Sequence, residues 1–291
     1  MTVEINDDGE TGILNEPIQG SIRVVKIDGT TEKPLQGAEF TLYDSDNEAV
    51  KTLTTNADGI VDFGKIRYGK YTVKETTAPK HYILDDTPIP FEVLENEKIY
   101  GYTHKNTPEY GKGKFIKTSE DGIIEGVTFH IYGTSNTGVA VDETVVTDKN
   151  GSVSLELLTG TYIVEEIKVA ERYIAPSPQR ITIKANKTST VKFENVLKKG
   201  GLMIEKINSK HPEIKISGAV FTVYKGDGTK YADVPEVATG IYSLTDIPHG
   251  TYIVKEISAP TGYILDNGSY SFEIKNAEQV VIVNKLEKRN K

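Results

Sequence analysis

The run G-S-I-R-V-V-K-I, residues 20–27, has the alternation of a β-strand with one buried face. Successive side chains of a strand point to opposite faces of the sheet, so Lys26 lies on the same face as Ile22 and Val24. An unpaired ammonium is too costly to bury among such residues. The run therefore predicts a strand, and it also predicts a partner that removes the charge of Lys26.

The pattern around Lys26 returns twice further along the chain. Lys117 lies 91 residues after Lys26 and Lys206 lies 89 residues after Lys117, and each follows a glycine by six residues. Three other motifs keep the same order and spacing: G-A-E-F-T-L-Y (37–43), with G-V-T-F-H-I-Y (126–132) and G-A-V-F-T-V-Y (218–224); G-K-Y-T-V-K-E (69–75), with G-T-Y-I-V-E-E (160–166) and G-T-Y-I-V-K-E (250–256); and K-H-Y-I-L-D (80–85), with E-R-Y-I-A-P (171–176) and T-G-Y-I-L-D (261–266). This repetition indicates tandem domains, each long enough to have its own core.

Short alternating runs within each repeat are separated by turn signals such as N-A-D-G (56–59) and D-K-N-G (148–151). No stretch keeps a helical period for three turns. The sequence predicts an all-β chain of three tandem Greek-key β-sandwiches, of the prealbumin or immunoglobulin type, in an extended array. We expect the repeats to span residues 20–108, 109–198 and 199–291.

The N-terminal segment resembles the end of a repeat. Asn106 and Asn195 each precede the next opening glycine by five residues, and Asn15 stands in the same relation to Gly20. We therefore interpret residues 1–19 as a remnant of the closing strands of a preceding repeat, in a chain cut from a longer array. Asn15 is expected to stay unreacted, because the lysine and glutamate of its own repeat would lie upstream.

Composition excludes several classes of function. The net charge of −8 argues against nucleic acid or an anionic membrane as a partner, and no apolar run is long enough to span a bilayer. The absence of cysteine excludes thiol nucleophiles, redox pairs and zinc ribbons. The five histidines lack metal-ligand spacing, and D-S-D-N-E (44–48) is a solvated turn rather than a calcium loop. We predict no cofactor and no metal.

Two further polar residues share the core-facing side. Glu75 has the parity of Tyr71 and Val73 in its strand, and Asn106 has that of His104 in the closing strand. The same placement recurs three times, giving the sets Lys26, Glu75 and Asn106; Lys117, Glu166 and Asn195; and Lys206, Glu256 and Asn284.

Such a trio permits a specific reaction. Burial favours the neutral forms of lysine and glutamate, and a neutral amine is a nucleophile. A protonated glutamate polarises the asparagine carboxamide and carries protons to the departing nitrogen. The lysine attacks the carboxamide carbon, ammonia leaves, and an amide joins the first strand to the last.

The alternative is ordinary surface chemistry. A lysine in a strand is usually solvated, and a Lys–Glu pair is usually an exposed ion pair worth about 0–1 kcal/mol. Three residue types that share core parity at matched spacing in three repeats favour the covalent interpretation.

The opening strand, the G-x-Y-x-V-x-E segment and the closing asparagine resemble the CnaB (SpaA-like) domains of Gram-positive surface adhesins and pilins. The resemblance covers residues 20–291, and E-T-T-A-P (75–79) and E-I-S-A-P (256–260) extend it. It implies a prealbumin-like fold with spontaneous isopeptide bonds Lys26–Asn106, Lys117–Asn195 and Lys206–Asn284, promoted by Glu75, Glu166 and Glu256. The middle repeat departs from the pattern at E-E-I-K-V-A-E-R-Y (165–173), which lacks the Ala-Pro step.

The expected function is structural. We expect a stalk segment of a cell-wall-anchored extracellular protein, not an enzyme, whose partners are the neighbouring repeats. The alternatives are a ligand-binding adhesin module that engages a host matrix protein and a pilus subunit, although no sorting motif or pilin-type lysine motif is present.

Overall fold

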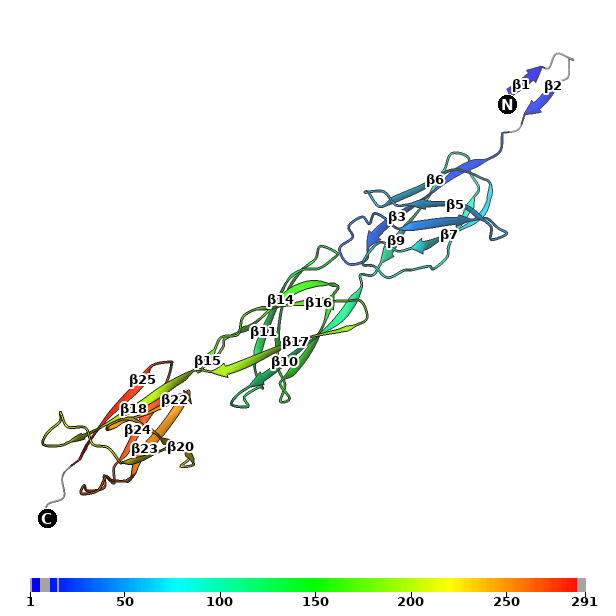
Figure 1. The fold of residues 1–291 in the computed structure, drawn as a ribbon. Coiled ribbons are helices and arrows are strands. Elements are labelled where there is room, and N and C mark those ends of the chain that lie inside the picture. Colours follow the sequence, from blue (N-terminus) through cyan, green and yellow to red (C-terminus); the bar gives the residue numbers. More distant parts are fainter. Residues whose placement is uncertain (1, 6–10, 15, 287–291) are drawn as a thin grey trace.

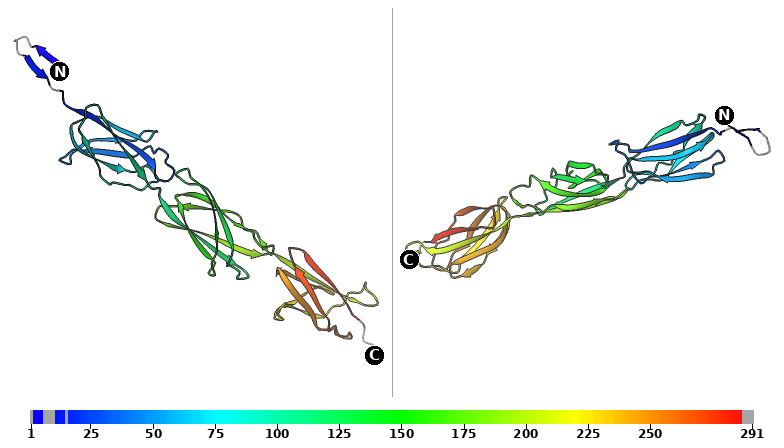
Figure 2. Two further views of the ribbon diagram at one scale, coloured as in Figure 1. Left: turned by 180° about the vertical axis from the view of Figure 1, so that it is seen from behind. Right: turned by 90° about the horizontal axis from the view of Figure 1, so that it is seen from above.

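The computed structural model describes residues 2–5, 11–14 and 16–286, and every regular element among them is a β-strand. Three β-sandwiches follow one another in an elongated row (Figure 1). A hairpin of β1 (Thr2–Ile5) and β2 (Thr11–Leu14) precedes them. Views from behind and from above show the same succession (Figure 2). The prediction of an all-β tandem array is confirmed. Asn15 lies outside the described residues, so the origin of residues 1–19 stays a prediction.

Each sandwich consists of two sheets. In the first repeat these are β6 (Ile60–Arg67), β3 (Gln19–Asp28) and β9 (Ile99–Asn106), facing β5 (Ala49–Thr54), β4 (Glu39–Tyr43), β7 (Gly69–Thr77) and β8 (Ile89–Val93). In the second they are β13 (Ser152–Leu158), β10 (Tyr110–Ser119), β17 (Thr188–Leu197) and β15 (Tyr173–Ile174), facing β12 (Ala140–Val146), β11 (Thr128–Thr134), β14 (Gly160–Ile167) and β16 (Gln179–Ile183). In the third they are β21 (Glu236–Ala238), β22 (Ile241–Pro248), β18 (Lys199–Asn208) and β25 (Gln279–Leu286), facing β20 (Lys230–Val234), β19 (Val220–Lys225), β23 (Gly250–Ser258) and β24 (Ser269–Ile274).

The first strand of every repeat pairs in parallel with the last. This holds for β3 with β9, for β10 with β17 and for β18 with β25. The remaining strand pairs are antiparallel. The strand by which the chain enters a repeat therefore lies beside the strand by which it leaves.

Each repeat has its own apolar core between its two sheets. Along β3, buried and half-buried side chains alternate without a break, and Ile22 and Val24 are fully buried. This is the pattern of a strand with one face against a core. It places Lys26 inward, as the sequence predicts.

Short hydrogen-bonded junctions connect the repeats. The main-chain N–H of Glu109 donates to His81 of the first repeat at 2.9 Å, and its carbonyl accepts from Thr159 of the second at 3.0 Å. Lys198 has the same arrangement at the second junction. Its main-chain N–H donates to the carbonyl oxygen of Arg172 at 2.9 Å, and its carbonyl oxygen accepts from the main-chain N–H of His249 at 2.7 Å. Because one junction residue is bonded to both neighbours, each linker is tied to the sandwich before it and to the sandwich after it.

Candidate functional site

The three lysines are among the most deeply buried side chains of the molecule. Lys26, Lys117 and Lys206 have 1% or less of their surface exposed. Each lies on the first strand of its repeat and points between the two sheets. A charged side chain at such a position requires close compensation.

A turn glycine sets the backbone position of each lysine. The carbonyl oxygen of Gly59 accepts a hydrogen bond from the main-chain N–H of Lys26 at 2.7 Å. The φ angle of Gly59 is +71°, and a Cβ atom at Gly59 would lie 2.3 Å from the carbonyl oxygen of Lys26. Glycine alone satisfies both the conformation and the close approach. Gly151 and Gly240 have the same role for Lys117 and Lys206, with hydrogen bonds of 2.7 and 2.8 Å.

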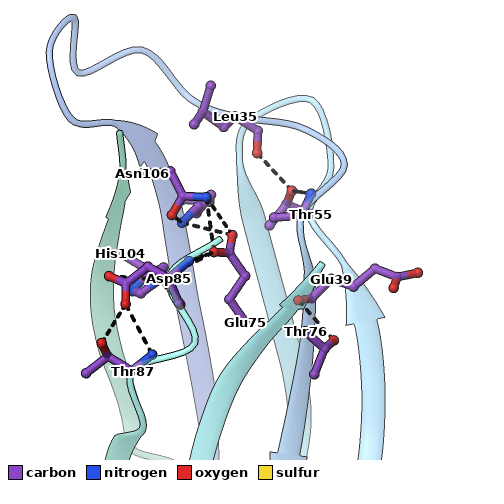
Figure 3. Close-up of polar contacts among 11 residues, drawn as sticks. Leu35, Glu39, Thr55, Glu75, Thr76, Asp85, Thr87, His104 and Asn106 are labelled. Atoms are coloured by element: carbon purple, nitrogen blue, oxygen red, sulfur yellow. Dashed lines mark hydrogen bonds and ion pairs between the residues drawn. The ribbon is translucent and has the colours of Figure 1, made fainter. Parts of the chain in front are cut away.

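In the first repeat the lysine, glutamate and asparagine form one closed cluster. Lys26 Nζ donates to Asn106 Oδ1 and lies 3.0 Å from Glu75 Oε1. Asn106 Nδ2 donates to both Glu75 oxygens, at 2.9 and 3.0 Å (Figure 3). The carboxamide oxygen thus faces the lysine and its nitrogen faces the carboxylate. In a reaction that joined the amine to the carboxamide carbon, this orientation would place the carboxylate where it could carry protons to the amide nitrogen.

The second repeat brings the same three residue types together with one contact missing. Lys117 Nζ donates to Glu166 Oε2 at 2.7 Å, and Asn195 Nδ2 donates to Glu166 Oε1 at 2.8 Å. Asn195 Oδ1 is buried and has no hydrogen-bond partner. The glutamate therefore bridges the other two groups, and the carboxamide oxygen is left without the donor that Lys26 supplies in the first repeat.

The third repeat has a different arrangement around its asparagine. Lys206 Nζ donates to Asn284 Oδ1 at 2.6 Å and lies 2.6 Å from Glu256 Oε1. Asn284 Nδ2 donates to Asp266 Oδ2 at 2.7 Å, and not to Glu256. Sequence reasoning missed Asp266, although the aspartate that ends T-G-Y-I-L-D (261–266) was its signal.

Burial makes the lysines easier to deprotonate. It is the largest cause acting on the pKa of Lys26, Lys117 and Lys206, and it outweighs the glutamate beside each, which acts in the opposite direction. The pKa of all three ammonium groups is therefore lowered from its ordinary value of 10.5. A larger neutral fraction is available for nucleophilic attack.

Other polar groups surround the first cluster. The Asp85 main-chain N–H donates to Glu75 Oε2 at 3.0 Å. His104 is buried beside the cluster, with Nε2 at 3.9 Å from Glu75 Oε2 (Figure 3). Burial, followed by the charge of Lys26, lowers the pKa of His104, which favours its neutral form.

In the first two repeats the tyrosine of the fourth repeated motif is hydrogen-bonded near the end of the lysine strand. Tyr82 OH donates to Asp28 at 2.7 Å, and Tyr173 OH donates to Asp121 at 2.7 Å. These bonds connect the segment that follows β7 or β14 to the last residue of β3 and to the turn after β10. The spacing of these tyrosines in the sequence does not indicate the contact.

A cavity of about 210 Å³ opens onto the second cluster. Glu166 and Asn195 contribute to its lining, together with Arg172 and Tyr173 from the segment that lacks the Ala-Pro step.

Within residues 2–5, 11–14 and 16–286 we find no helix able to cross a membrane. Among the same residues no three His, Cys, Asp or Glu side chains are grouped so that they could bind a metal ion.

Comparison with protein families gives one match that is repeated three times. The family described as SpaA, a prealbumin-like fold domain, matches residues 20–108, 111–197 and 200–288. These stretches cover all three lysine, glutamate and asparagine sets.

The individual relatives include proteins of Streptococcus pyogenes and Staphylococcus aureus. The trypsin-resistant surface T6 protein of Streptococcus pyogenes serotype M6 is 30% identical over 127 residues, covering 42% of this chain and 23% of that protein. Serine-aspartate repeat-containing protein D of Staphylococcus aureus strain Newman is 27% identical over 274 residues, covering 80% of this chain and 21% of that protein. The chain thus spans less than a quarter of the length of either relative.

Among solved structures, the Bacillus anthracis TIE protein superposes with a TM-score of 0.74 at 26% identity. The superposition covers 93% of this chain and 51% of that protein. Because the superposition covers nearly the whole chain, the two structures are similar in the succession of their domains as well as in single domains.

Proposed function

Because the chain belongs to the SpaA family of prealbumin-like fold domains, we propose that it is a stalk segment of a Gram-positive cell-surface protein whose domains are each closed by a spontaneous Lys–Asn isopeptide bond. The observation that carries the proposal is the contact of each buried lysine with its glutamate, at 3.0, 2.7 and 2.6 Å, beside a buried asparagine. Extracellular location and attachment to the cell wall through the parent protein are part of the proposal.

The reaction follows from the first cluster. A proton passes from Lys26 to Glu75, 3.0 Å away, and leaves a neutral amine. The amine attacks the carbon of the Asn106 carboxamide, whose oxygen it already contacts. Glu75 is bonded to Asn106 Nδ2 and gives the proton to that nitrogen, so the bond from the carboxamide carbon to Nδ2 breaks and ammonia departs. The lysine nitrogen loses its second proton to the Glu75 carboxylate, and a secondary amide remains. The folded core supplies the fixed geometry that such a slow reaction requires.

The position of the bond explains its use. It would join β3 to β9, the strands by which the chain enters and leaves the repeat. A pull on the two ends would load the amide directly, while the 80-residue loop between the linked residues stays folded. Unfolding under force is governed by rates, and here it would require breaking a covalent bond. In a chain without cysteine, the amide replaces the disulfide as a staple, and it resists reductants.

The relatives support this proposal at the level of surface proteins. The name of the Streptococcus pyogenes relative describes a trypsin-resistant surface protein. Resistance to trypsin is the property that covalent closure of each domain would confer, since cleavage requires local opening.

Peptide mapping tests the proposal directly. After digestion under denaturing conditions, mass spectrometry should find branched peptides that join Lys26 to Asn106, Lys117 to Asn195 and Lys206 to Asn284. Linear peptides alone, with intact lysine and asparagine, would refute it.

A further inference from the structure

The three clusters differ in what holds the leaving nitrogen. In the first two repeats the asparagine Nδ2 donates to the glutamate, at 2.9 Å for Asn106 and 2.8 Å for Asn195. In the third, Asn284 Nδ2 donates to Asp266 Oδ2 at 2.7 Å. Glu256 is left to contact Lys206, at 2.6 Å. In the third repeat one carboxylate therefore contacts the lysine and a second contacts the asparagine, whereas in the other two repeats a single glutamate contacts both.

Asp266 is fixed in this position by several bonds. Its main-chain N–H donates to Glu256 Oε2 at 3.1 Å, its Oδ1 accepts the Gly268 N–H at 2.7 Å, and its Oδ2 accepts the Tyr270 hydroxyl. Burial opposes ionisation of Asp266, but the hydrogen bonds from Tyr270, Gly268 and Asn284 outweigh it and lower the pKa of the carboxyl. An anion therefore faces the carboxamide nitrogen.

The other repeats lack this arrangement at the same place in their motif. Asp85 follows Glu75 by ten residues, as Asp266 follows Glu256, but its Oδ1 accepts from the main chain and hydroxyl of Thr87. The second repeat has Pro176 there, which has neither a carboxylate nor an N–H to donate.

We propose that Asp266 is a second catalytic residue of the third repeat, which orients the Asn284 carboxamide and stabilises the ammonium that leaves it. The inference rests on the proposed isopeptide bond. In the overall step the Lys206 ammonium and the carboxamide become a secondary amide and an ammonium ion. The bond from Lys206 Nζ to the carboxamide carbon forms, and the bond from that carbon to Nδ2 breaks. The lysine nitrogen loses two protons to Glu256, which lies 2.6 Å from it. After the attack both nitrogens are bonded to one carbon, so Glu256 can pass the protons on to Nδ2, which Asp266 Oδ2 holds in place.

A time course of crosslinking in newly made protein tests this role. The chain is synthesised in a cell-free system, samples are denatured at intervals, and the branched peptides of each repeat are quantified by mass spectrometry. Asp266→Asn keeps an acceptor for Gly268 but removes the charge, and it should slow the Lys206–Asn284 bond by at least about tenfold. The first two repeats of the same molecules are internal controls and should react at the wild-type rate. Asp227→Asn, at an exposed turn of the third repeat, should change nothing.

Two further variants separate charge from structure. Asp266→Ser also keeps an acceptor for the Gly268 N–H, and it should slow the reaction as Asp266→Asn does. Tyr270→Phe removes a bond to the same oxygen but leaves the anion, so its effect should be much smaller. Wild-type rates in both Asp266 variants, or equal slowing by Tyr270→Phe, would overturn the inference and leave the proposed function standing. If the wild-type chain never forms the Lys206–Asn284 bond, the proposed function itself fails for this repeat.

Discussion

Lys206 and Asn284 lie directly opposite each other on the parallel strands β18 and β25, with Nζ at 2.6 Å from Oδ1. In the first repeat the residue opposite Lys26 is His104, and Asn106 lies two positions further along β9. The second repeat has the register of the first. The same three residue types therefore meet in two registers of the closing strand. Only in the third repeat, where the lysine and the asparagine are directly opposite, does a second carboxylate contact the asparagine.

The glutamates are predicted to be necessary for the reaction. Glu166→Gln keeps the size of the side chain but cannot accept the lysine proton, so the Lys117–Asn195 bond should not form. Glu165→Gln is the matched control, because Glu165 is the next residue and its carboxylate bonds to His130 outside the cluster, at 3.1 Å. Peptide mapping should find the branched peptide in the control and not in Glu166→Gln. Crosslinking of both variants would contradict the role of Glu166.

Loss of one crosslink should be visible in stability. Asn106→Ala keeps the ion pair of Lys26 with Glu75 but cannot form the amide. Closure of an 80-residue loop is worth about 4–5 kcal/mol in the chain-entropy model, so the free energy of unfolding of the first repeat should fall by at least that amount. Urea unfolding of the variant and the wild type measures the difference. A loss of about 1 kcal/mol, the size of a single hydrogen bond, would mean that no crosslink was removed.

The unreacted lysine should make stability depend on pH. In Asn106→Ala, burial holds the pKa of folded Lys26 below the value of 10.5 that applies when the chain is unfolded. Between these two values the unfolded chain binds more protons, so the free energy of unfolding rises with pH. The cost of the buried ammonium is complete below the lowered pKa and disappears above 10.5.

The crosslinked wild type is the control for this dependence, because an amide nitrogen does not titrate. Urea unfolding at a series of alkaline pH values should give a steeper rise for Asn106→Ala than for the wild type. Parallel curves would contradict the prediction.

Force should distinguish the crosslinked repeats from an open one. When the wild-type chain is pulled from its ends, the loops between linked residues should contribute no extension. Asn106→Ala should add one unfolding event that releases the first repeat, since β3 and β9 are then held by hydrogen bonds alone. Single-molecule traces with three unfolding events in the wild type would be incompatible with covalent closure.

The alternation of side chains was enough to predict the strands and the inward direction of Lys26, Glu75 and Asn106. It could not predict the register of the closing strand. A shift of two residues returns every side chain to the same face, so Asn284 has the correct parity in either geometry. The aspartate that ends the motif marked Asp266 as a candidate, but the motif could not predict its contact, because Asp85 occupies the matching place and bonds to Thr87 instead.

The intact mass of the purified chain tests the central claim most directly. Three isopeptide bonds release three molecules of ammonia, so the account predicts a mass lower than the sequence mass by that amount. Lys26→Ala, Lys117→Ala and Lys206→Ala should each reduce the deficit by one ammonia. A wild-type mass equal to that of the full sequence would contradict the account.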